Sequence, residues 1–426
     1  MACIICFLED DYQERLRNIS QSKGERFEDS LKEYKENFFG EFKYLKGIRQ
    51  CPEHNNLNYN TIVWATRLHQ TIARINDKER FFESVRNIYI KWISGKTVNA
   101  INSLKRLMSS KSLFSKRSNI DSRVFFRGRK SQSFLKKEDL YHIPFDKRYL
   151  VPNQRYSLTG QPIFYFGLSV LSVLAELRVS VNSFDDVYFS SFVIPDDSFQ
   201  IFDFTNNFQS EIKNAEILID LGDDIDYHDT QFNNVLNHTR EFYKYLLLNI
   251  ASFKRGIEGS NFIEEYVIPQ MITEIARKKN YNGILFTSTR INKKIAYSTN
   301  VFEVNRYKEN LALFTKYQAK EKFDLNLINK FLIGNPLKTK DYQEIDFSEI
   351  EKLGKQIIRL NNKKRKFTSL KQISELTAIS YKTLFENIKV KDESGNDIDY
   401  FDHQIGKLHN YILYTELLKL RNQLLK

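Results

Sequence analysis

The sequence contains few residues that cross-link or rigidify a chain, and it has no long apolar run. Its 426 residues include 3 cysteines, 7 prolines and 15 glycines. This excludes a collagen-like or low-complexity polymer, and three cysteines cannot pair completely among themselves. A charged residue interrupts every apolar stretch, as Lys244 does between Phe242 and Leu248, so no segment reaches the roughly 18 apolar residues that span a bilayer. We therefore expect no membrane association.

The first residues also lack the pattern of a secretory signal. The apolar run that follows Met1 ends at Leu8, no basic residue precedes it, and Glu9, Asp10 and Asp11 come directly after it. A signal peptide begins with basic residues and has a longer apolar core. We therefore expect a cytoplasmic protein, whose reducing surroundings leave cysteines free to bind a metal.

Hydrophobic residues make up 41% of the chain and aromatic residues 14%, as expected of a folded protein, and the length suggests more than one domain. The net charge of +12 lies in the flanks: Lys and Arg number 21 against 14 Asp and Glu in residues 1–120, 29 against 30 in 121–350, and 15 against 9 in 351–426. A basic flank can bind nucleic acid by counterion release, although lysine-rich helix faces are common without it. Nucleic-acid binding is therefore the less favoured alternative.

Hydrophobic periodicity divides the chain into a helical start, a mixed centre and a helical end. Apolar residues recur at helical spacing in 57–109, with Asp77 placed to cap the second run, and a Ser- and Lys-rich linker is expected at 109–118. Strand patterns at 123–127, 163–166, 187–194, 200–204 and 283–287 alternate with helical patterns at 169–180, 231–253 and 265–279, and helical patterns return after 310. The prediction is an α+β protein with a helical domain at 1–118, a mixed domain at 119–310 and a helical region at 311–426.

Residues 368–388 have the outline of a helix-turn-helix, with the turn at 378–380. Lys382, Thr383 and Asn387 would then face a groove of DNA. The turn lacks glycine and pairs of helices are common, so we favour a helical hairpin that packs on the central domain.

All three cysteines belong to a pattern that is typical of a zinc site. Cys3 and Cys6 are separated by two residues, as are Cys51 and His54, and this spacing lets a tight turn place two donors on one tetrahedral metal. The alternative is a buried cysteine pair beside an exposed histidine, which the 44-residue gap between the two pairs leaves open. Four protein ligands leave no open position, so a zinc ion here would be structural.

His54 also has a competing interpretation. Arg49 and His54 show the Arg-x4-His spacing of HEPN ribonucleases, a short and weak motif. A histidine that binds zinc must be neutral, so His54 could hardly also serve as an acid catalyst.

Polar residues interrupt or follow several apolar segments of the central region. Arg127 follows Phe125 and Phe126 directly, and a helix that begins at 169 with a serine N-cap carries Glu176. Further on, the strand at 283–287 leads to Ser288.

In order and spacing, these segments resemble the RES domain family, named for an arginine, a glutamate and a serine. The resemblance covers roughly residues 121–310. It rests on aromatic-Arg-x-Arg at 126–129, Arg-Tyr-Ser at 155–157 followed by Gly160, Pro-Ile-Phe-Tyr at 162–165, Glu176, Pro-Gln at 269–270, and Gly-Ile at 283–284 leading to Ser288. It implies an ADP-ribosyltransferase-like fold and an enzyme that consumes NAD, cleaving it with phosphate or water.

The resemblance also implies that Arg127, Tyr165, Glu176 and Ser288 line the active site, with Arg155 assisting. The chemistry is consistent with these roles. A guanidinium such as Arg127 binds a pyrophosphate bidentately, and Tyr165 can stack on nicotinamide. Glu176 can stabilise the positive charge that develops when the nicotinamide–ribose bond breaks, while Ser288 holds a ribose hydroxyl or the neighbouring strand.

The amino-terminal Cys-x2-Cys-Phe and its helices resemble the zinc-bearing, HEPN-related region that precedes RES domains in longer members. The expected function is therefore NAD degradation in a toxin-like or defence-like bacterial enzyme, held in check by an inhibitory protein partner or a homo-oligomer. Two alternatives remain, a nucleic-acid-binding regulator that uses the basic flanks and an ADP-ribosyltransferase that modifies a macromolecule.

Overall fold

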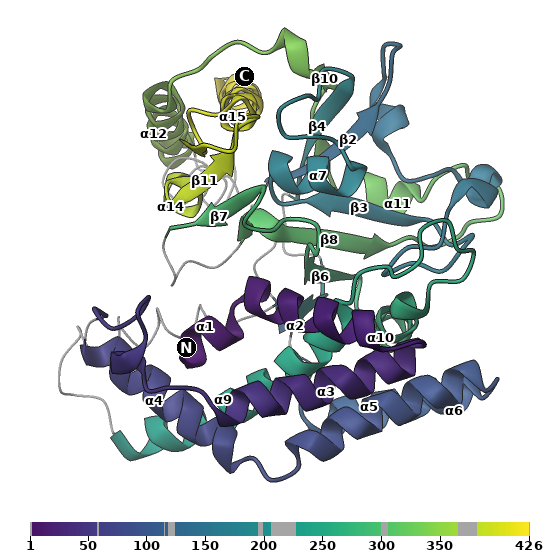
Figure 1. Ribbon diagram of the computed structural model, residues 1–426. Helices are drawn as coiled ribbons and strands as arrows, with labels where there is room; N and C mark the ends of the chain where they lie inside the picture. The colour runs from purple at the N-terminus through teal and green to yellow at the C-terminus, as the bar shows by residue number, and fades with distance from the viewer. Residues whose placement is uncertain are drawn as a thin grey trace. The chain divides into compact units, whose positions relative to one another are not determined.

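A computed structural model describes residues 2–57, 59–114, 116–117, 124–194, 199–205, 227–299, 306–364 and 381–425. These residues form two compact units (Figure 1). Unit 1 comprises described residues within 1–115, 153–158 and 204–278, and unit 2 comprises those within 116–152, 159–203 and 279–426. The predicted division into three consecutive domains stays a prediction.

Unit 1 is built from helices. They are α1 (Ile4–Leu8), α2 (Asp10–Lys23), α3 (Phe27–Lys43), α4 (Tyr59–Arg74), α5 (Lys78–Ile93), α6 (Thr97–Ser110), α9 (Tyr227–Ala251) and α10 (Val267–Lys278), with 3-10 turns η1 (Ile48–Gln50) and η4 (Glu264–Tyr266). The predicted helices in 57–109 are confirmed as α4, α5 and α6. Asp77 does occupy the N-cap position of α5, but its side chain does not cap the helix and accepts hydrogen bonds from Lys111 and Tyr243 instead.

Unit 2 contains a sheet to which nine of the described strands belong. Their order is β1-β5-β6-β8-β3-β2-β4-β10, with β9 also paired to β4. The strands are β1 (Lys116–Arg117), β2 (Val124–Lys130), β3 (Ile163–Gly167), β4 (Val187–Val193), β5 (Ile201–Phe204), β6 (Gly283–Thr287), β8 (Glu309–Phe314), β9 (Leu332–Ile333) and β10 (Leu337–Lys338). All five predicted strands are present, and β6, β8, β3, β2 and β4 pair antiparallel in that order.

The remaining elements of unit 2 are short turns, a second sheet and further helices. They are η2 (Lys137–Leu140), η3 (Phe145–Leu150), η5 (Arg306–Lys308), η6 (Thr339–Asp341), α7 (Val170–Leu177), α11 (Leu325–Ile328), α12 (Phe347–Lys364), α14 (Tyr381–Phe385), α15 (Gln404–Leu425), and the sheet β12-β11-β7 from Asp397–Asp399, Ile388–Lys391 and Ala296–Ser298. The α+β class with helical flanks is therefore confirmed. Most of the predicted helix-turn-helix, namely residues 365–380, lies outside the described residues, as do residues 115 and 118 of the expected linker.

The two faces of the large sheet carry different apolar clusters. Successive residues of a strand point to opposite faces, and Phe125 and Phe126 accordingly belong to different clusters. Phe125 packs with Phe164 and Phe192 on one face. On the other face, Phe126 packs beneath α7, which places the helix that carries Glu176 against that side of the sheet.

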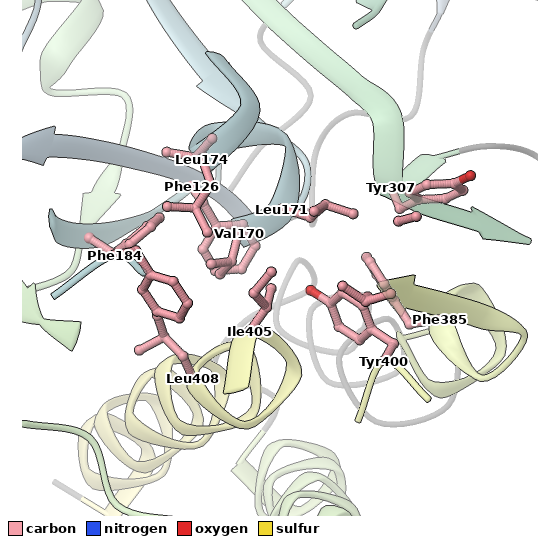
Figure 2. Close-up of a cluster of buried hydrophobic side chains, with 14 of the residues drawn as sticks. Phe126, Val170, Leu171, Leu174, Phe184, Tyr307, Phe385, Tyr400, Ile405 and Leu408 are labelled. Carbon is pink, nitrogen blue, oxygen red and sulfur yellow. The ribbon is translucent and has the colours of Figure 1, made fainter. Parts of the chain in front are cut away.

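The cluster around Phe126 also joins α7 to the later part of unit 2 (Figure 2). Apolar side chains of α7, among them Leu171 and Leu174, lie in the same cluster as Ile405 and Leu408 of α15. In addition, α12 and α15 pack side by side (Figure 1). One face of α7 is therefore buried by the sheet and by a helix that follows it by more than two hundred residues.

Among the described residues, none of the helices combines the length and the apolar character that crossing a bilayer requires.

Candidate functional site

The Glu176 carboxylate receives hydrogen bonds from three side chains of unit 2. Its Oε1 accepts one from Ser288 Oγ at 2.7 Å and one from Asn310 Nδ2 at 2.9 Å. Its Oε2 accepts one from Arg290 Nε at 3.1 Å. We call Glu176, Ser288, Arg290 and Asn310 the Glu176 cluster. It brings together the glutamate and the serine that the sequence predicted, although 112 positions separate them.

Three elements position the cluster. Glu176 lies in the last turn of α7, Ser288 directly follows β6, and Asn310 is the second residue of β8. The β6–β8 register pairs Phe286 with Asn310, and the backbone N–H of Ser288 donates to the carbonyl oxygen of Lys308 at 2.7 Å. The sheet therefore fixes Ser288 and Asn310 beneath the end of α7.

The predicted N-cap of α7 is confirmed. Ser169 Oγ accepts a hydrogen bond from the backbone N–H of Ser172 at 2.9 Å, and Ser172 Oγ accepts one from the backbone N–H of Ser169 at 3.2 Å. This reciprocal arrangement satisfies two backbone donors at the start of the helix. It fixes the point at which α7 leaves β3.

Two glycines let α7 lie close to the sheet. A Cβ atom on Gly167 would lie 2.2 Å from Ser172 Oγ and 3.0 Å from the backbone oxygen of Ser169. A Cβ atom on Gly128 would lie 2.7 Å from Cγ1 of Val173. A larger residue at Gly167 would press on the start of α7, and one at Gly128 would press on Val173 in the middle of the helix.

Sequence reasoning missed two members of the cluster. Arg290 is partly exposed, with 32% of its side chain accessible, whereas Asn310 is buried. The position of Arg290, two residues after Ser288, was a signal that could have drawn attention to it. Asn310 carries no such signal, because a single asparagine in an apolar strand can equally be a structural residue.

Arg127 makes main-chain contacts. Its Nη1 donates to the carbonyl oxygen of Tyr165 at 2.7 Å and its Nη2 to that of Tyr141 at 3.2 Å, while its Cζ lies 5.2 Å from the centre of the Phe164 ring. Burial lowers the pKa of the Arg127 guanidinium to about 10, so it remains charged at neutral pH. The two carbonyls and the ring compensate in part for the burial of this charge.

Strand alternation places Arg127 and Glu176 on opposite faces of the sheet. Arg127 follows Phe125 by two residues and shares its face, whereas α7 covers the face of Phe126. Tyr165 lies on the α7 face, because β3 and β8 pair it with Ala312, two residues from Asn310. The structure therefore places Tyr165, but not Arg127, on the face of the Glu176 cluster.

Arg155 belongs to unit 1, where it contacts the chain after α9. Its guanidinium donates to the carbonyl oxygens of Ala251 and Phe253 and lies 5.0 Å from the centre of the Tyr266 ring. These contacts hold a short segment of unit 1 against α9 and η4, and all of the partners belong to unit 1.

The four predicted metal ligands come together in unit 1. Ligand atoms of Cys3, Cys6, Cys51 and His54 all lie within 4.8 Å of one another, and all four residues are buried. Cys6 Sγ is 3.9 Å from Cys3 Sγ and 3.5 Å from Cys51 Sγ, and His54 Nδ1 is 3.2–3.6 Å from the three sulfurs. In tetrahedral zinc sites such separations are about 3.8 Å for two sulfurs and about 3.5 Å for sulfur and nitrogen. The donor set and its spacing therefore fit a metal ion such as zinc.

Hydrogen bonds within this cluster raise the pKa values of two of its members. The hydrogen bond with Cys6 raises the pKa of His54 to about 9, and that with Cys3 raises the pKa of Cys6 to about 12. A metal would bind the deprotonated forms and release these protons. His54 is buried with its Nδ1 among three sulfurs, whereas Arg49 is exposed. The described residues therefore do not support the alternative ribonuclease site at Arg49 and His54.

Comparisons with known proteins give one informative match. The chain is 26% identical over 230 residues, 51% of its length, to a curated protein of Bacillus subtilis (strain 168) named "Putative toxin YopC". The match spans 47% of that protein, so the chain covers about half of its length. The sequence matches no protein-family model, and no solved structure matches it at a significant level.

Proposed function

We propose that the Glu176 cluster is the active site of a RES-type enzyme that cleaves the nicotinamide–ribose bond of NAD. The observation that carries this proposal is the hydrogen bond from Ser288 to Glu176. The family resemblance implied these two residues from the order and spacing of its motifs, and they meet although they lie in distant parts of the chain. The buried Asn310 provides a second donor to the same oxygen and fixes the carboxylate further.

The proposed chemistry uses Glu176 as an oriented anion. As the bond from the ribose carbon to the nicotinamide nitrogen breaks, the electron pair leaves with nicotinamide and positive charge develops on the ribose. Glu176 stabilises that charge, and an oxygen of phosphate or water then bonds to the same carbon, with water losing a proton. A fixed charge of this kind is typically worth about 3–4 kcal/mol in the transition state.

The biological role that we propose is that of a toxin or a defence protein. The name of the similar Bacillus subtilis protein is consistent with this role. An enzyme that depletes NAD would need an inhibitory protein partner or an inactive assembly in the cell that makes it. The basic flanks favour nucleic acid as a weaker alternative partner.

We further propose that Cys3, Cys6, Cys51 and His54 hold one structural zinc ion. Four protein ligands leave no open position for substrate, so zinc would supply folding free energy and no catalytic step.

Glu176→Gln provides the main test, because glutamine keeps the shape and loses the charge. We expect kcat for NAD loss to fall by about 10²–10³-fold while ADP-ribose still binds. Nicotinamide release, followed by chromatography with and without phosphate, measures turnover and identifies the acceptor. Glu321→Gln, which removes an exposed carboxylate of unit 2, is the matched control. Turnover within a few-fold of wild type would remove Glu176 from the mechanism.

A further inference from the structure

The guanidinium of Arg290 is only partly used within the protein. Its Nε donates to Glu176 Oε2, and no described residue accepts a hydrogen bond from its two terminal amino groups. About a third of the side chain is exposed, at 32%. A guanidinium offers five donors in a planar fork, so one edge can hold a carboxylate while the other binds an anion.

The arginines in the motifs of the family resemblance are engaged elsewhere. Arg127 donates to two carbonyl oxygens on the opposite face of the sheet from α7, and Arg129 donates to the carbonyl oxygen of Asp139. Arg155 is held by carbonyl oxygens of unit 1. Arg290 is therefore the guanidinium that combines contact with Glu176 and unused donors among the described residues.

The segment around Arg290 carries further positive charge. Lys293 and Lys294 follow it, both are exposed, and no acidic residue occurs between Ser288 and Asn300 in the sequence. A turn at Asn292 holds this segment, since Asn292 Oδ1 accepts from the backbone N–H of Lys294 at 3.1 Å. This charge favours an anionic ligand beside Glu176.

A second buried group indicates what lies next to that anion. Asn310 is 2% exposed, its Nδ2 donates to Glu176, and its Oδ1 is buried without a donor among the described residues. A buried acceptor of this kind is costly unless a ligand or water satisfies it. A ligand hydroxyl group could donate to Asn310 Oδ1. The cluster therefore suits a ligand that carries a hydroxyl close to an anionic group.

We propose that Arg290 binds the phosphate of a sugar phosphate whose ribose hydroxyl donates to Asn310 Oδ1 beside Glu176. This inference rests on the proposed function and deepens it: in NAD, the nicotinamide ribose carries both the hydroxyls and the adjoining phosphate. Arg290 then bridges Glu176 and the substrate, and it selects phosphorylated nucleotides over free nucleosides.

The test compares Arg290→Gln, Arg290→Lys and the control Lys340→Gln, an exposed cation near the β10 edge of the sheet. Calorimetric titration of the full chain with ADP-ribose and, separately, with inorganic phosphate measures binding, and NAD turnover gives KM and kcat. We expect Arg290→Gln to weaken ADP-ribose binding and raise KM by about ten- to a hundredfold. Arg290→Lys should lie between, because lysine keeps the charge without the fork, and Lys340→Gln should match wild type.

The remaining results overturn either this inference or the proposed reaction alone. If Arg290→Gln binds ADP-ribose as tightly as wild type, the sugar-phosphate contact is excluded. The same holds if the variant weakens only the binding of inorganic phosphate. A loss of kcat and thermal stability with unchanged KM would make Arg290 a structural partner of Glu176. If wild type binds ADP-ribose through Arg290 but does not turn over NAD, the proposed reaction fails and the binding site stands. If wild type does not bind ADP-ribose, the binding site itself is wrong.

Discussion

At the scale of single residues, Glu176 is held by a hydroxyl, an amide and a guanidinium. The hydroxyl and the amide lie on the sheet side of the carboxylate and share Oε1, whereas Arg290 takes Oε2. A carboxylate bound in this way has little rotational freedom left to lose when substrate binds. Preorganisation of this kind is what lets a single charge contribute strongly to a transition state.

For Arg127, the structure predicts a larger effect on stability than on catalysis. Lysine keeps the positive charge but cannot donate to the carbonyl oxygens of Tyr165 and Tyr141 at the same time. We expect Arg127→Lys to lower the free energy of unfolding by about 1.5–3 kcal/mol, the typical value for a charged hydrogen bond. Urea denaturation measures this change, and KM for NAD is measured in parallel. A stable variant with a strongly raised KM would show instead that Arg127 contacts the substrate.

Motif reasoning located Glu176 and Ser288 because several short patterns agree in order along the chain. It could not locate Asn310 or Arg290, since their meeting with Glu176 depends on strand register and on the path of the chain after β6. It also could not tell that Arg127 turns away from α7. That outcome follows from alternation along β2, which a one-residue shift in register would reverse.

At the scale of elements, α7 depends on the absence of side chains beneath it. Gly167→Ala would place a Cβ atom 2.2 Å from Ser172 Oγ. We expect a loss of stability of about 1–3 kcal/mol, as for other overpacked cores, together with a large fall in NAD turnover because Glu176 moves with the helix. Thermal denaturation and the turnover assay check both effects.

Gly40→Ala serves as the contrasting control. Gly40 lies in α3, is exposed, and has no atom within 4 Å of an added Cβ. Alanine favours a helix by about 1 kcal/mol over glycine, so this variant should be more stable and equally active. If Gly167→Ala behaves like Gly40→Ala, the close approach of α7 is not required.

A metal held by Cys3, Cys6, Cys51 and His54, as proposed above, would explain how α1 can be ordered. A helix of five residues is too short to be stable by itself; Cys3 is the N-cap of α1 and Cys6 is its third residue. We expect His54→Gln to lose zinc and lower the thermal stability of unit 1, whereas His69→Gln, which alters a histidine outside the cluster, should retain both. Elemental analysis of freshly purified protein measures the metal, and wild type without stoichiometric zinc would contradict the assignment.

Sequence patterns predicted the secondary-structure elements better than the way in which these elements pair and pack. The strands predicted within 123–287 and the helices predicted within 57–109 and 169–279 are present because period-2 and period-3.6 patterns are local properties of the chain. The region 311–426, in contrast, was predicted to be helical and contains β9, β10, β11 and β12 beside its helices. The sheet order places β3 between β8 and β2, and the clusters place α15 against α7, both through non-local packing that no local pattern encodes. The four residues that could hold a metal were predictable because the spacing within each pair is a local property of the sequence.

At the scale of the whole molecule, the buried His409 makes stability depend on pH. Burial lowers its pKa to about 3, and its Nδ1 lies 2.8 Å from the Tyr400 hydroxyl oxygen. In the unfolded chain the pKa is about 6.5, so between these values the unfolded state binds more protons and acid favours unfolding. Stability is therefore full above about pH 6.5 and is lost towards pH 3, at up to about 1.4 kcal/mol per pH unit.

Urea denaturation between pH 4 and 7 checks this expectation. The free energy of unfolding should fall less steeply with decreasing pH in His409→Gln, by up to about 1.4 kcal/mol per pH unit, because glutamine does not titrate. Equal slopes in the two proteins would show that other groups cause the acid sensitivity. His409→Asn provides a second non-titrating variant if the glutamine variant folds poorly.

The packing of α15 on α7 has a consequence for protein synthesis. A ribosome adds residues in order, and the glutamate-bearing helix emerges long before β6, β8 and the helix that covers it. Until those later segments leave the exit tunnel, Glu176 lacks Ser288, Arg290 and Asn310, and α7 lacks the part of its apolar cover that α15 provides. If the Glu176 cluster is the active site proposed above, an unfinished nascent chain is inactive, and activity begins only after translation has passed the segment that forms α15.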